Sequence, residues 1–408
     1  MSLWQPFWGP WRGKVVGMTE LFAAVAVLPG GLESEGALEL AALGASEIKS
    51  LRRAVGFRID RAGFARLHLR ARLPFRLLRQ LAEFPCASAR DLYAGVQAAA
   101  DWEHWLPPSR RFRVEVSGSA PGLAHSHFTA LQVKNALVDL QRQRWGERSS
   151  IDLADPDLAL HLHLGGGRAV LSLEGSTTSL HRRGYRAAMG LAPLKENLAA
   201  GLIALSGWNG SVPLADPLCG SGTLLIEAAC RVLGRAPGLQ EAADGSPLPR
   251  CFAFERWPDF DPLIWRQEVE AAVELRRDTL SDGSPLAPIV GLEKDPAVLE
   301  QARGNAAGAG VTPWLQLQQG DARDFQPPQT PGVLVCNPPY GERLGASDDL
   351  EALYADLGDM LKQRCSGWSL WLLSGNPELT GALRMKARRK VPVSNGGIDC
   401  RWLHYEIR

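Results

Sequence analysis

The sequence predicts a chain in two parts, an α+β front half followed by an α/β half built on a mainly parallel sheet. With 408 residues, the chain is too long for one ordinary core, so we expect two or three domains. Before about residue 190, short strand-like and helix-like segments alternate irregularly. After Leu191, apolar strands and amphipathic helices follow one another in turn, which is typical of a parallel sheet.

The front half contains one strong helix pattern and several weaker segments. Between 130 and 145, Ala136, Leu137 and Leu140 recur at helical spacing, and Lys134 falls on the opposite side. Three glycines, at 165–167, separate two strands of a hairpin. We expect strands at 22–28 and 112–116, helices at 35–43, 73–81 and 130–145, and hairpins that pair 51–59 with 64–69 and 158–164 with 169–173.

The second half is expected to place its functional loops along one edge of its sheet. The carboxyl ends of parallel strands meet at the same edge, and ligands bind there in such folds. Residues 234–262 are rich in Pro and Gly and are expected to form a loop insertion. We expect strands at 213–215, 288–292, 314–317, 333–336 and 370–373, helices at 221–233, 296–307 and 350–364, and an antiparallel hairpin that pairs 390–393 with 402–407.

The composition, 45% hydrophobic and 22% charged, is that of a soluble globular protein. No apolar run approaches the roughly 18 residues that a membrane helix requires, and no signal peptide is recognisable. Residues 1–19 carry three Trp among Pro and Gly and are expected to be a disordered tail. The seven cysteines form no Cys-x-x-Cys pair, so we expect reduced thiols, no metal and a cytoplasmic location.

Charge is distributed unevenly along a chain whose net charge is only +1. Up to Gly190 there are 24 Lys and Arg against 17 Asp and Glu, and beyond it there are 21 against 27. A basic front half joined to a mildly acidic back half fits a module that holds RNA next to a catalytic module. Charge alone leaves open a basic surface without a partner.

The segment Asp216–Leu224 predicts a nucleotide-sized site at a strand-to-helix turn. Gly220 and Gly222 permit a tight turn and a close approach of the backbone, and the next helix begins with unpaired N–H groups. The dinucleotide pattern G-x-G-x-x-G is absent, because Leu225 stands at its third glycine. Glu293 and Asp321 end the next two strands.

The roles expected of these acids follow from their places. Glu293 is expected to accept hydrogen bonds from two ribose hydroxyls, and Asp321 to accept one from an adenine amino group. For Asp295, a helix cap is the favoured interpretation.

The segment Asn337–Tyr340 reads Asn-Pro-Pro-Tyr after a buried strand. The lone pair of an exocyclic or amide nitrogen is delocalised, and hydrogen bonds from its N–H groups draw it toward a tetrahedral, nucleophilic form. The Asn337 side-chain oxygen and the Pro338 carbonyl can accept those bonds from preorganised positions. Tyr340 offers a face on which a base can stack. With the glycine turn, this predicts methylation of such a nitrogen by S-adenosylmethionine.

Several segments together closely resemble one family. The chain resembles the bacterial THUMP-containing methyltransferases that make N2-methylguanosine in 23S rRNA, from about Leu21 onward. Asn-Pro-Pro-Tyr alone also occurs in adenine-N6 and glutamine-N5 methyltransferases. The segments that carry the resemblance are 91–96, 133–136, 180–186, 192–198, 216–229 and 337–344.

The resemblance implies three domains: an N-terminal ferredoxin-like domain at 20–72, a THUMP RNA-binding domain at 73–180, and a class I, Rossmann-like, seven-stranded methyltransferase domain at 181–408. Some members carry a second methyltransferase domain that makes 7-methylguanosine, and we expect none here because the chain ends at Arg408. Glu293 stands where an Asp is frequent, and its longer carboxylate should keep the ribose contact.

The resemblance also places residues 193–197 over the cofactor, and the expected site is the following. Cofactor contacts are Pro193, Lys195, Asn197, Asp216, Leu218, Cys219, Gly220, Ser221, Gly222, Thr223, Glu293, Lys294, Asp321, Ala322 and Asn337. Catalytic residues are Asn337, Pro338, Pro339 and Tyr340. RNA contacts are Arg110, Arg111, Lys134, Arg142, Arg182, Arg183 and Arg186. A basic run at 386–390 is a further candidate for RNA.

We therefore expect an RNA methyltransferase that acts on a guanosine N2 in 23S rRNA or a pre-ribosomal particle, without membrane or metal and as a monomer. Methylation of a tRNA guanosine or of adenine N6 uses similar chemistry and stays open. A glutamine methyltransferase would leave the basic front half without a purpose. A non-catalytic assembly factor with the same fold is the alternative of another class, and calorimetry with S-adenosylmethionine separates it from an enzyme.

Overall fold

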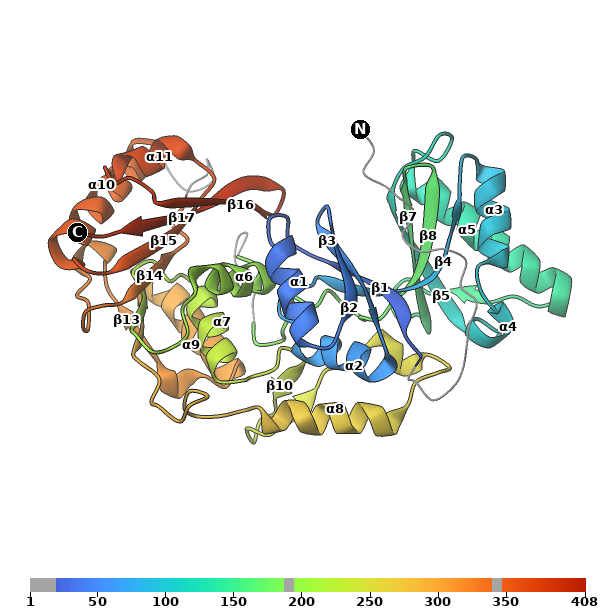
Figure 1. Cartoon of the computed structure of the whole chain (residues 1–408), viewed down its shortest axis with the longest axis horizontal. Coiled ribbons are helices and arrows are strands. Elements are labelled where there is room, and N and C mark those ends of the chain that lie inside the picture. The colour runs from blue at the N-terminus through green and yellow to red at the C-terminus, as the bar shows by residue number, and fades with distance from the viewer. Residues whose placement is uncertain (1–19, 187–193, 340–346) are drawn as a thin grey trace.

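The structure of the protein, a computed structural model, describes residues 20–186, 194–339 and 347–408. It contains two large sheets side by side, one from each half of the chain (Figure 1). The first is a mixed sheet with helices packed on it, and the second is mainly parallel. The predicted order, α+β followed by α/β, is confirmed. No helix within the described ranges is long and apolar enough to cross a membrane.

The first sheet has eight strands in the order β2-β3-β1-β4-β8-β7-β5-β6. Central β4 pairs with β1 on one side and with β8 on the other, both antiparallel. The predicted ferredoxin-like and THUMP parts therefore share one continuous sheet, and the boundary between 72 and 73 stays a prediction. The strands are β1 (Phe22–Val27), β2 (Ser46–Leu51), β3 (Ala54–Ile59), β4 (Arg76–Pro85), β5 (Arg111–Gly118), β6 (Ser150–Ile151), β7 (Leu158–Gly165) and β8 (Arg168–Glu174), and the helices are α1 (Glu33–Ala42), α2 (Arg61–Arg70), α3 (Ala89–Ala98), α4 (Trp102–Trp105) and α5 (Ser126–Trp145).

Two predictions for the front half were wrong. Residues 64–69 form part of helix α2 rather than a strand, because the Asp60 carboxylate caps the helix by accepting the Gly63 N–H at 2.7 Å. Residues 73–81 contribute to strand β4 rather than a helix. Leu77 and Leu78 are both buried, and they point to opposite faces of a central strand. A short apolar run of this kind fits either period.

The second sheet has seven strands in the order β13-β12-β9-β14-β15-β17-β16. The first five of these run parallel, and β17 is antiparallel to both β15 and β16. The loops that follow β9, β12, β13 and β14 therefore share one edge, here named the strand-end rim. The strands are β9 (Leu214–Asp216), β12 (Ile289–Glu293), β13 (Leu315–Gln319), β14 (Val333–Cys336), β15 (Ser369–Ser374), β16 (Arg389–Asn395) and β17 (Ile398–Glu406).

Helices cover both faces of this sheet. Apolar side chains of α6 (Glu196–Ser206) and α7 (Thr223–Val232) join Trp371 and Trp402 in one buried cluster. Tyr354 of α10 (Ser347–Arg364) and Trp368 belong to the cluster on the other face. Two further helices of this half are α9 (Pro296–Gly308) and α11 (Pro377–Ala382).

The segment predicted as a loop insertion is folded and ties the two halves together. It contains a short hairpin, β10 (Leu239–Glu241) with β11 (Pro247–Pro249), and a 3₁₀ turn, η1 (Ala253–Arg256), and it leads into α8 (Pro262–Glu274). Its aromatic side chains pack on α2, with the Phe254 and His68 rings 4.6 Å apart. Burial lowers the pKa of His68 to about 3. Glu268 of α8 binds the Arg66 guanidinium at 2.6 Å.

A second contact joins the β16–β17 hairpin to the front half. The Ser394 N–H donates to the Gly30 carbonyl at 2.9 Å. Gly31 has φ +90°, and a Cβ on it would come within 2.0 Å of the Pro392 carbonyl oxygen. Only a glycine permits this approach, so the two halves meet here backbone to backbone.

We predict that Gly31→Ala lowers the free energy of unfolding by about 2–4 kcal/mol, since it combines a left-handed conformation with a backbone clash. Gly30→Ala is the matched control, because the nearest atom to its new Cβ is Arg53 Cγ at 3.4 Å. Urea unfolding of both variants measures the difference. Equal stability of the two variants would contradict the contact.

Candidate active site

The glycine turn at Asp216–Leu224 stands at the strand-end rim, between β9 and α7. Gly220 and Gly222 have φ +53° and +80°, which L side chains adopt only with strain. A Cβ on Gly220 would meet no atom within 4 Å, so this side of the turn is open to a ligand. Hydrogen bonds to β12 and α9 hold the turn in place. The Cys219 N–H donates to the Leu292 carbonyl, and Asn305 of α9 donates to the Ser221 carbonyl at 3.0 Å.

Asp216 is a buried carboxyl group at the base of this turn, with 2% of its surface exposed. One oxygen accepts the Leu218 N–H at 3.0 Å, and the Cys336 thiol is its neighbour from β14. Burial raises the pKa of Asp216 to about 7, and the nearby Glu293 carboxylate adds to the rise. Burial also raises the pKa values of the Cys219 and Cys336 thiols.

The two other predicted acids also lie at the rim. Glu293 accepts the Gly220 N–H at 3.0 Å with one oxygen and the Asp295 N–H at 2.9 Å with the other. It therefore links the loop after β9 to the loop after β12. Asp321 binds Arg323 at 2.7 Å and Lys294 at 3.4 Å, and the bonds from Arg323 lower its pKa. Asp295 accepts the Ala297 N–H and caps α9, as predicted. The ribose and adenine roles stay predictions.

Asn337 follows β14, the strand next to β9. The pairing of Val333 with Leu214 and of Leu334 with Ala215 places the two strand ends side by side. The Asn337 side-chain oxygen is shielded from solvent and has no hydrogen-bond partner among the described residues. Pro338 is buried, and the Tyr354 hydroxyl of α10 donates to the Pro339 carbonyl at 3.3 Å. An unpaired buried acceptor is rare, and substrate binding is one explanation for it.

The remaining expected cofactor contacts divide between the rim and other places. Leu218, Cys219, Ser221, Thr223, Lys294 and Ala322 belong to the rim loops or to the start of α7. Pro193 and Tyr340 lie outside the described residues. The Asn197 side chain is fully buried, donates to the Leu73 carbonyl and accepts the Leu198 N–H. This corrects the expectation that Asn197 contacts the cofactor. The Lys195 ammonium lies 5.0 Å from the centre of the Phe75 ring, also toward the front half.

Three of the six expected RNA-contact arginines bind other groups of the protein through their side chains. Arg183 is 5% exposed, and its guanidinium donates to the Leu180 and Arg72 carbonyls, which corrects its expected role. Arg186 binds Glu196 at 3.1 Å and donates to Thr223 at the start of α7. Arg111 lies 2.7 Å from Asp152. Of the others, Arg142 and Arg182 are exposed, and Arg110 and Lys134 are partly exposed.

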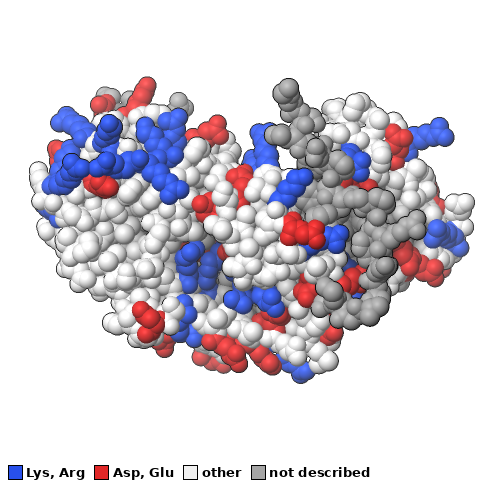
Figure 2. Space-filling view, viewed as in Figure 1, with Lys and Arg blue, Asp and Glu red and all other residues white. Residues whose placement is uncertain are grey.

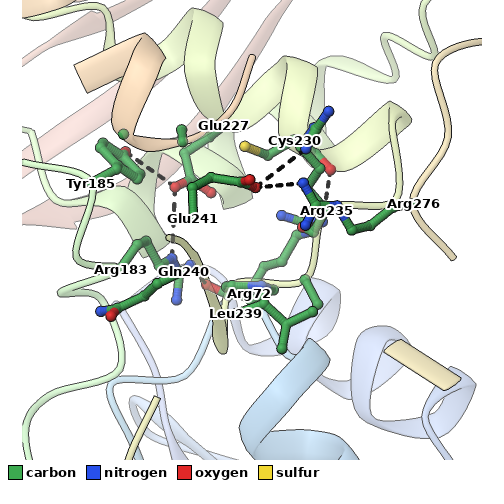
Figure 3. A pocket seen from close by; sticks show the side chains of 14 residues that line it. Arg72, Arg183, Tyr185, Glu227, Cys230, Arg235, Leu239, Gln240, Glu241 and Arg276 are labelled. Carbon is green, nitrogen blue, oxygen red and sulfur yellow. Dashed lines mark hydrogen bonds and ion pairs between the residues drawn. The ribbon is translucent and has the colours of Figure 1, made fainter. Parts of the chain in front are cut away.

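A charged cluster that no sequence pattern predicted lies at the junction of the halves (Figure 3). Tyr185 donates to Glu227 of α7 at 3.2 Å, and the Arg183 Nε lies 3.6 Å from the same carboxylate. Arg72 donates to the Cys230 carbonyl. The cluster surrounds a cavity of about 30 Å³, which has room for ordered water rather than a nucleotide. It lies along α7, one to two turns beyond the glycine turn, so it positions that helix.

Comparison with known proteins agrees with this arrangement. A model of the THUMP domain matches residues 86–174, and a model described as the RMKL-like methyltransferase domain matches residues 183–404. The second match covers more than half of the chain. The protein belongs to the RMKL-like methyltransferase family. Its second sheet is accordingly the class I methyltransferase sheet, and a THUMP domain precedes it along the chain.

Individual relatives support the assignment along most of the chain. A Synechocystis protein provisionally named RNA methyltransferase slr0064 is 42% identical over 377 residues, 92% of this chain and 94% of that protein. The ribosomal RNA large subunit methyltransferase K/L of Pseudomonas paraeruginosa is 39% identical over 400 residues, 96% of this chain and 53% of that protein. This chain thus spans about half the length of that K/L relative.

A solved structure shows the same fold throughout. The crystal structure of SMU.472, provisionally described as a methyltransferase and complexed with SAH, has a TM-score of 0.83 to this chain at 29% identity. The match covers 96% of this chain and 99% of that one.

We predict that Asp216 makes stability depend on pH in the cofactor-free protein. The folded state keeps the proton up to about pH 7, whereas an ordinary Asp loses it near 3.8. Unfolding then releases a proton between these values, so the contribution of Asp216 to stability falls as pH rises, by at most about 1.4 kcal/mol per pH unit.

The test is urea unfolding of wild type and Asp216→Asn at pH values across that range. The stability of Asp216→Asn relative to wild type should increase with pH, because the amide does not titrate. Asp295→Asn, a change at an exposed helix cap, is the control. Curves for wild type and Asp216→Asn that stay parallel would refute the raised pKa.

Proposed function

We propose that this protein transfers a methyl group from S-adenosylmethionine to the exocyclic N2 of a guanosine in 23S rRNA. The observation that carries the proposal is the shielded side-chain oxygen of Asn337, which has no hydrogen-bond partner in the described ranges and lies one strand away from the open glycine turn at Asp216–Gly222. A hydrogen-bond acceptor that the described fold leaves unused suits an N–H group of the substrate. The adjacent turn suits the methyl donor.

The residues at the rim fit the donor. Gly220 offers backbone to a ligand with no Cβ in the way, and Glu293 and Asp321 present carboxylates at the ends of the next two strands. These groups would hold the nucleoside part, and Asp216 would hold the turn that faces it. When bound, the donor supplies an electrophilic methyl group on a sulfonium.

The contribution of the chain is to prepare the nitrogen that accepts the methyl group. In this proposal the Asn337 side-chain oxygen accepts one amine hydrogen, and the Pro338 carbonyl accepts the other. Two acceptors draw the nitrogen toward tetrahedral geometry, so its lone pair points at the donor. Both prolines restrict the loop, and Tyr354 anchors it through the Pro339 carbonyl, so the acceptors need little rearrangement. Positioning of this kind supplies most of the rate enhancement.

RNA as the substrate is supported by the THUMP match and by the names of the relatives, which include a ribosomal RNA large subunit methyltransferase. Guanine N2 in 23S rRNA is the finer part of the proposal and rests on the family that the sequence resembles. A tRNA guanosine or an adenine N6 would meet the same acceptors at Asn337 and Pro338. A cytoplasmic location follows if the substrate is ribosomal.

We predict that Asn337→Ala lowers the turnover of RNA methylation by about 10²–10³-fold, because it removes a preorganised acceptor. Calorimetry should show S-adenosylhomocysteine binding within a few-fold of wild type. Asn209→Ala, an exposed Asn on the loop before β9, is the matched control and should leave turnover unchanged. The assay follows labelled methyl groups into separated rRNA and tRNA.

Three outcomes would count against the proposal. Turnover retained in Asn337→Ala would remove the assigned role of this residue. Transfer into tRNA alone would favour the first alternative substrate. Failure of the wild-type protein to bind S-adenosylmethionine would favour a non-catalytic assembly factor.

A further inference from the structure

The end of the chain is a basic island on an acidic domain. Residues 384–408 hold seven Lys and Arg against two acidic residues, whereas residues 191–383 hold 14 against 25. These basic residues fall in the connection between α11 and β16, on edge strand β16, and on or just beyond its neighbour β17. Segregation of this kind creates a local positive potential that the net charge of the domain does not reveal.

Five of these side chains form an exposed group, here named the hairpin surface. Figure 2 shows blue atoms gathered over α11 and the β16–β17 hairpin on one face of the molecule. Lys390 and Arg401 lie on the same face of the sheet, since Lys390 pairs with Leu403 and Arg401 with Pro392. The hairpin surface consists of Arg384, Lys386, Arg388, Lys390 and Arg401, all of which are exposed.

The hairpin surface begins at the strand-end rim. Cys336 is in register with Leu372, and Arg401 is in register with Ser374 of the same strand. Asn337 therefore lies within one residue step of the level of Arg401. The two strands are separated by β15 alone, which places them about 10 Å apart across the sheet. A polynucleotide whose base enters the rim must carry its neighbouring phosphates over this distance.

The cations of the hairpin surface are mostly uncommitted. Arg388 binds Glu406 at 2.9 Å, but no acidic partner of the other four occurs among the described residues. The contrast with the front half is clear, since Arg111 and Arg186 already bind carboxylates. A guanidinium or ammonium without a partner keeps its hydrogen bonds for an incoming anion. Arg384 also holds φ +51°, a conformation that an Arg adopts less readily than a Gly.

The surface continues toward the front half. The tip of the β16–β17 hairpin contacts Gly30 through Ser394, as described above. Close to Gly30 lies the turn between β2 and β3, whose Arg52 and Arg53 are exposed. Figure 2 shows a second group of blue atoms over the tip of β2 and β3 on the same face. A second group of exposed arginines, on the front half, thus lies beyond the tip of the β16–β17 hairpin.

We propose that the hairpin surface binds the phosphate backbone of the substrate RNA beside the nucleotide that enters the strand-end rim. This inference rests on the proposed function, because it assumes that the substrate is RNA. Contacts of this type hold and orient the strand without reading its sequence. A group of four cations that have no acidic partner among the described residues fits a polyanion rather than a single small anion.

The test is a fourfold variant, R384Q/K386Q/K390Q/R401Q, which leaves the Arg388–Glu406 pair in place. The probes are deproteinised 23S rRNA and a short synthetic RNA hairpin, and binding is measured without cofactor over a series of salt concentrations. Affinity should fall about tenfold or more at moderate salt, and the slope of log K against log salt should lose about 3 units, since each of the four lost phosphate contacts removes roughly 0.7–0.9. R266Q/R303Q, two exposed arginines on α8 and α9, is the control and should bind as wild type does.

Two further measurements separate this inference from the proposed function. Calorimetry with S-adenosylhomocysteine should give wild-type affinity in the fourfold variant, which shows that the rim is folded. Methylation by the variant should show a raised KM for RNA with kcat nearly unchanged. If the wild-type protein binds RNA but transfers no methyl group, the proposed function fails and the binding test still decides the surface. Wild-type affinity and salt dependence for RNA in the fourfold variant would overturn the inference. So would a variant that loses binding to anionic lipid vesicles but keeps its binding to RNA.

Discussion

The parallel pairing of β9 with β12 and β14 is the constraint on which the candidate active site depends. A predicted site residue stands at the end of each strand or directly after it, and the shared direction brings Asp216, Glu293 and Asn337 to one rim. Backbone hydrogen bonds at the rim then join neighbouring loops, since Glu293 accepts the Gly220 N–H and the Cys219 N–H reaches the Leu292 carbonyl. A shift of one residue in this register would turn Asp216 to the other face of the sheet.

The front half is bonded to the helix that begins at the glycine turn. Arg186 donates to Thr223 at the first residue of α7, and Tyr185 reaches Glu227 one turn later. Arg72 from the front half reaches the Cys230 carbonyl on the same helix. Arginines that are largely shielded from solvent are costly unless they are bonded, so the cluster holds one arrangement of the two halves. These bonds therefore connect the front half to the helix that starts at the glycine turn.

Much of the second half was predictable because its signals are local. The motif at Asp216–Leu224 combines a buried strand, glycines with positive φ and a helix start, and the structure contains all three. Asp295 was predictable as a cap from its place before Pro296. In the front half, the prediction of a helix at 73–81 was wrong because a central strand buried on both faces has no alternating pattern. Its environment is set by β1 and β8, which come from distant parts of the sequence.

The partners of charged side chains were the least predictable part of the site. Arg183 and Asn197 carry no local sign that their polar atoms are used by the Arg72 and Leu73 carbonyls, more than 100 positions earlier in the chain. Asn305 lies in an ordinary helical pattern, yet it supports the glycine turn from α9. Such long-range bonds decide which cations remain free for RNA, so the choice among basic residues needs the fold.

The central claim is that the rim presents an amine of an RNA base to a methyl donor through Asn337 and Pro338. The most direct test incubates the protein and S-adenosylmethionine with deproteinised 23S rRNA from cells that lack the gene, followed by nucleoside mass spectrometry and mapping of the modified position. The account predicts one new N2-methylguanosine at a single position. A methyl group on another atom, or none in RNA of any class, would contradict it.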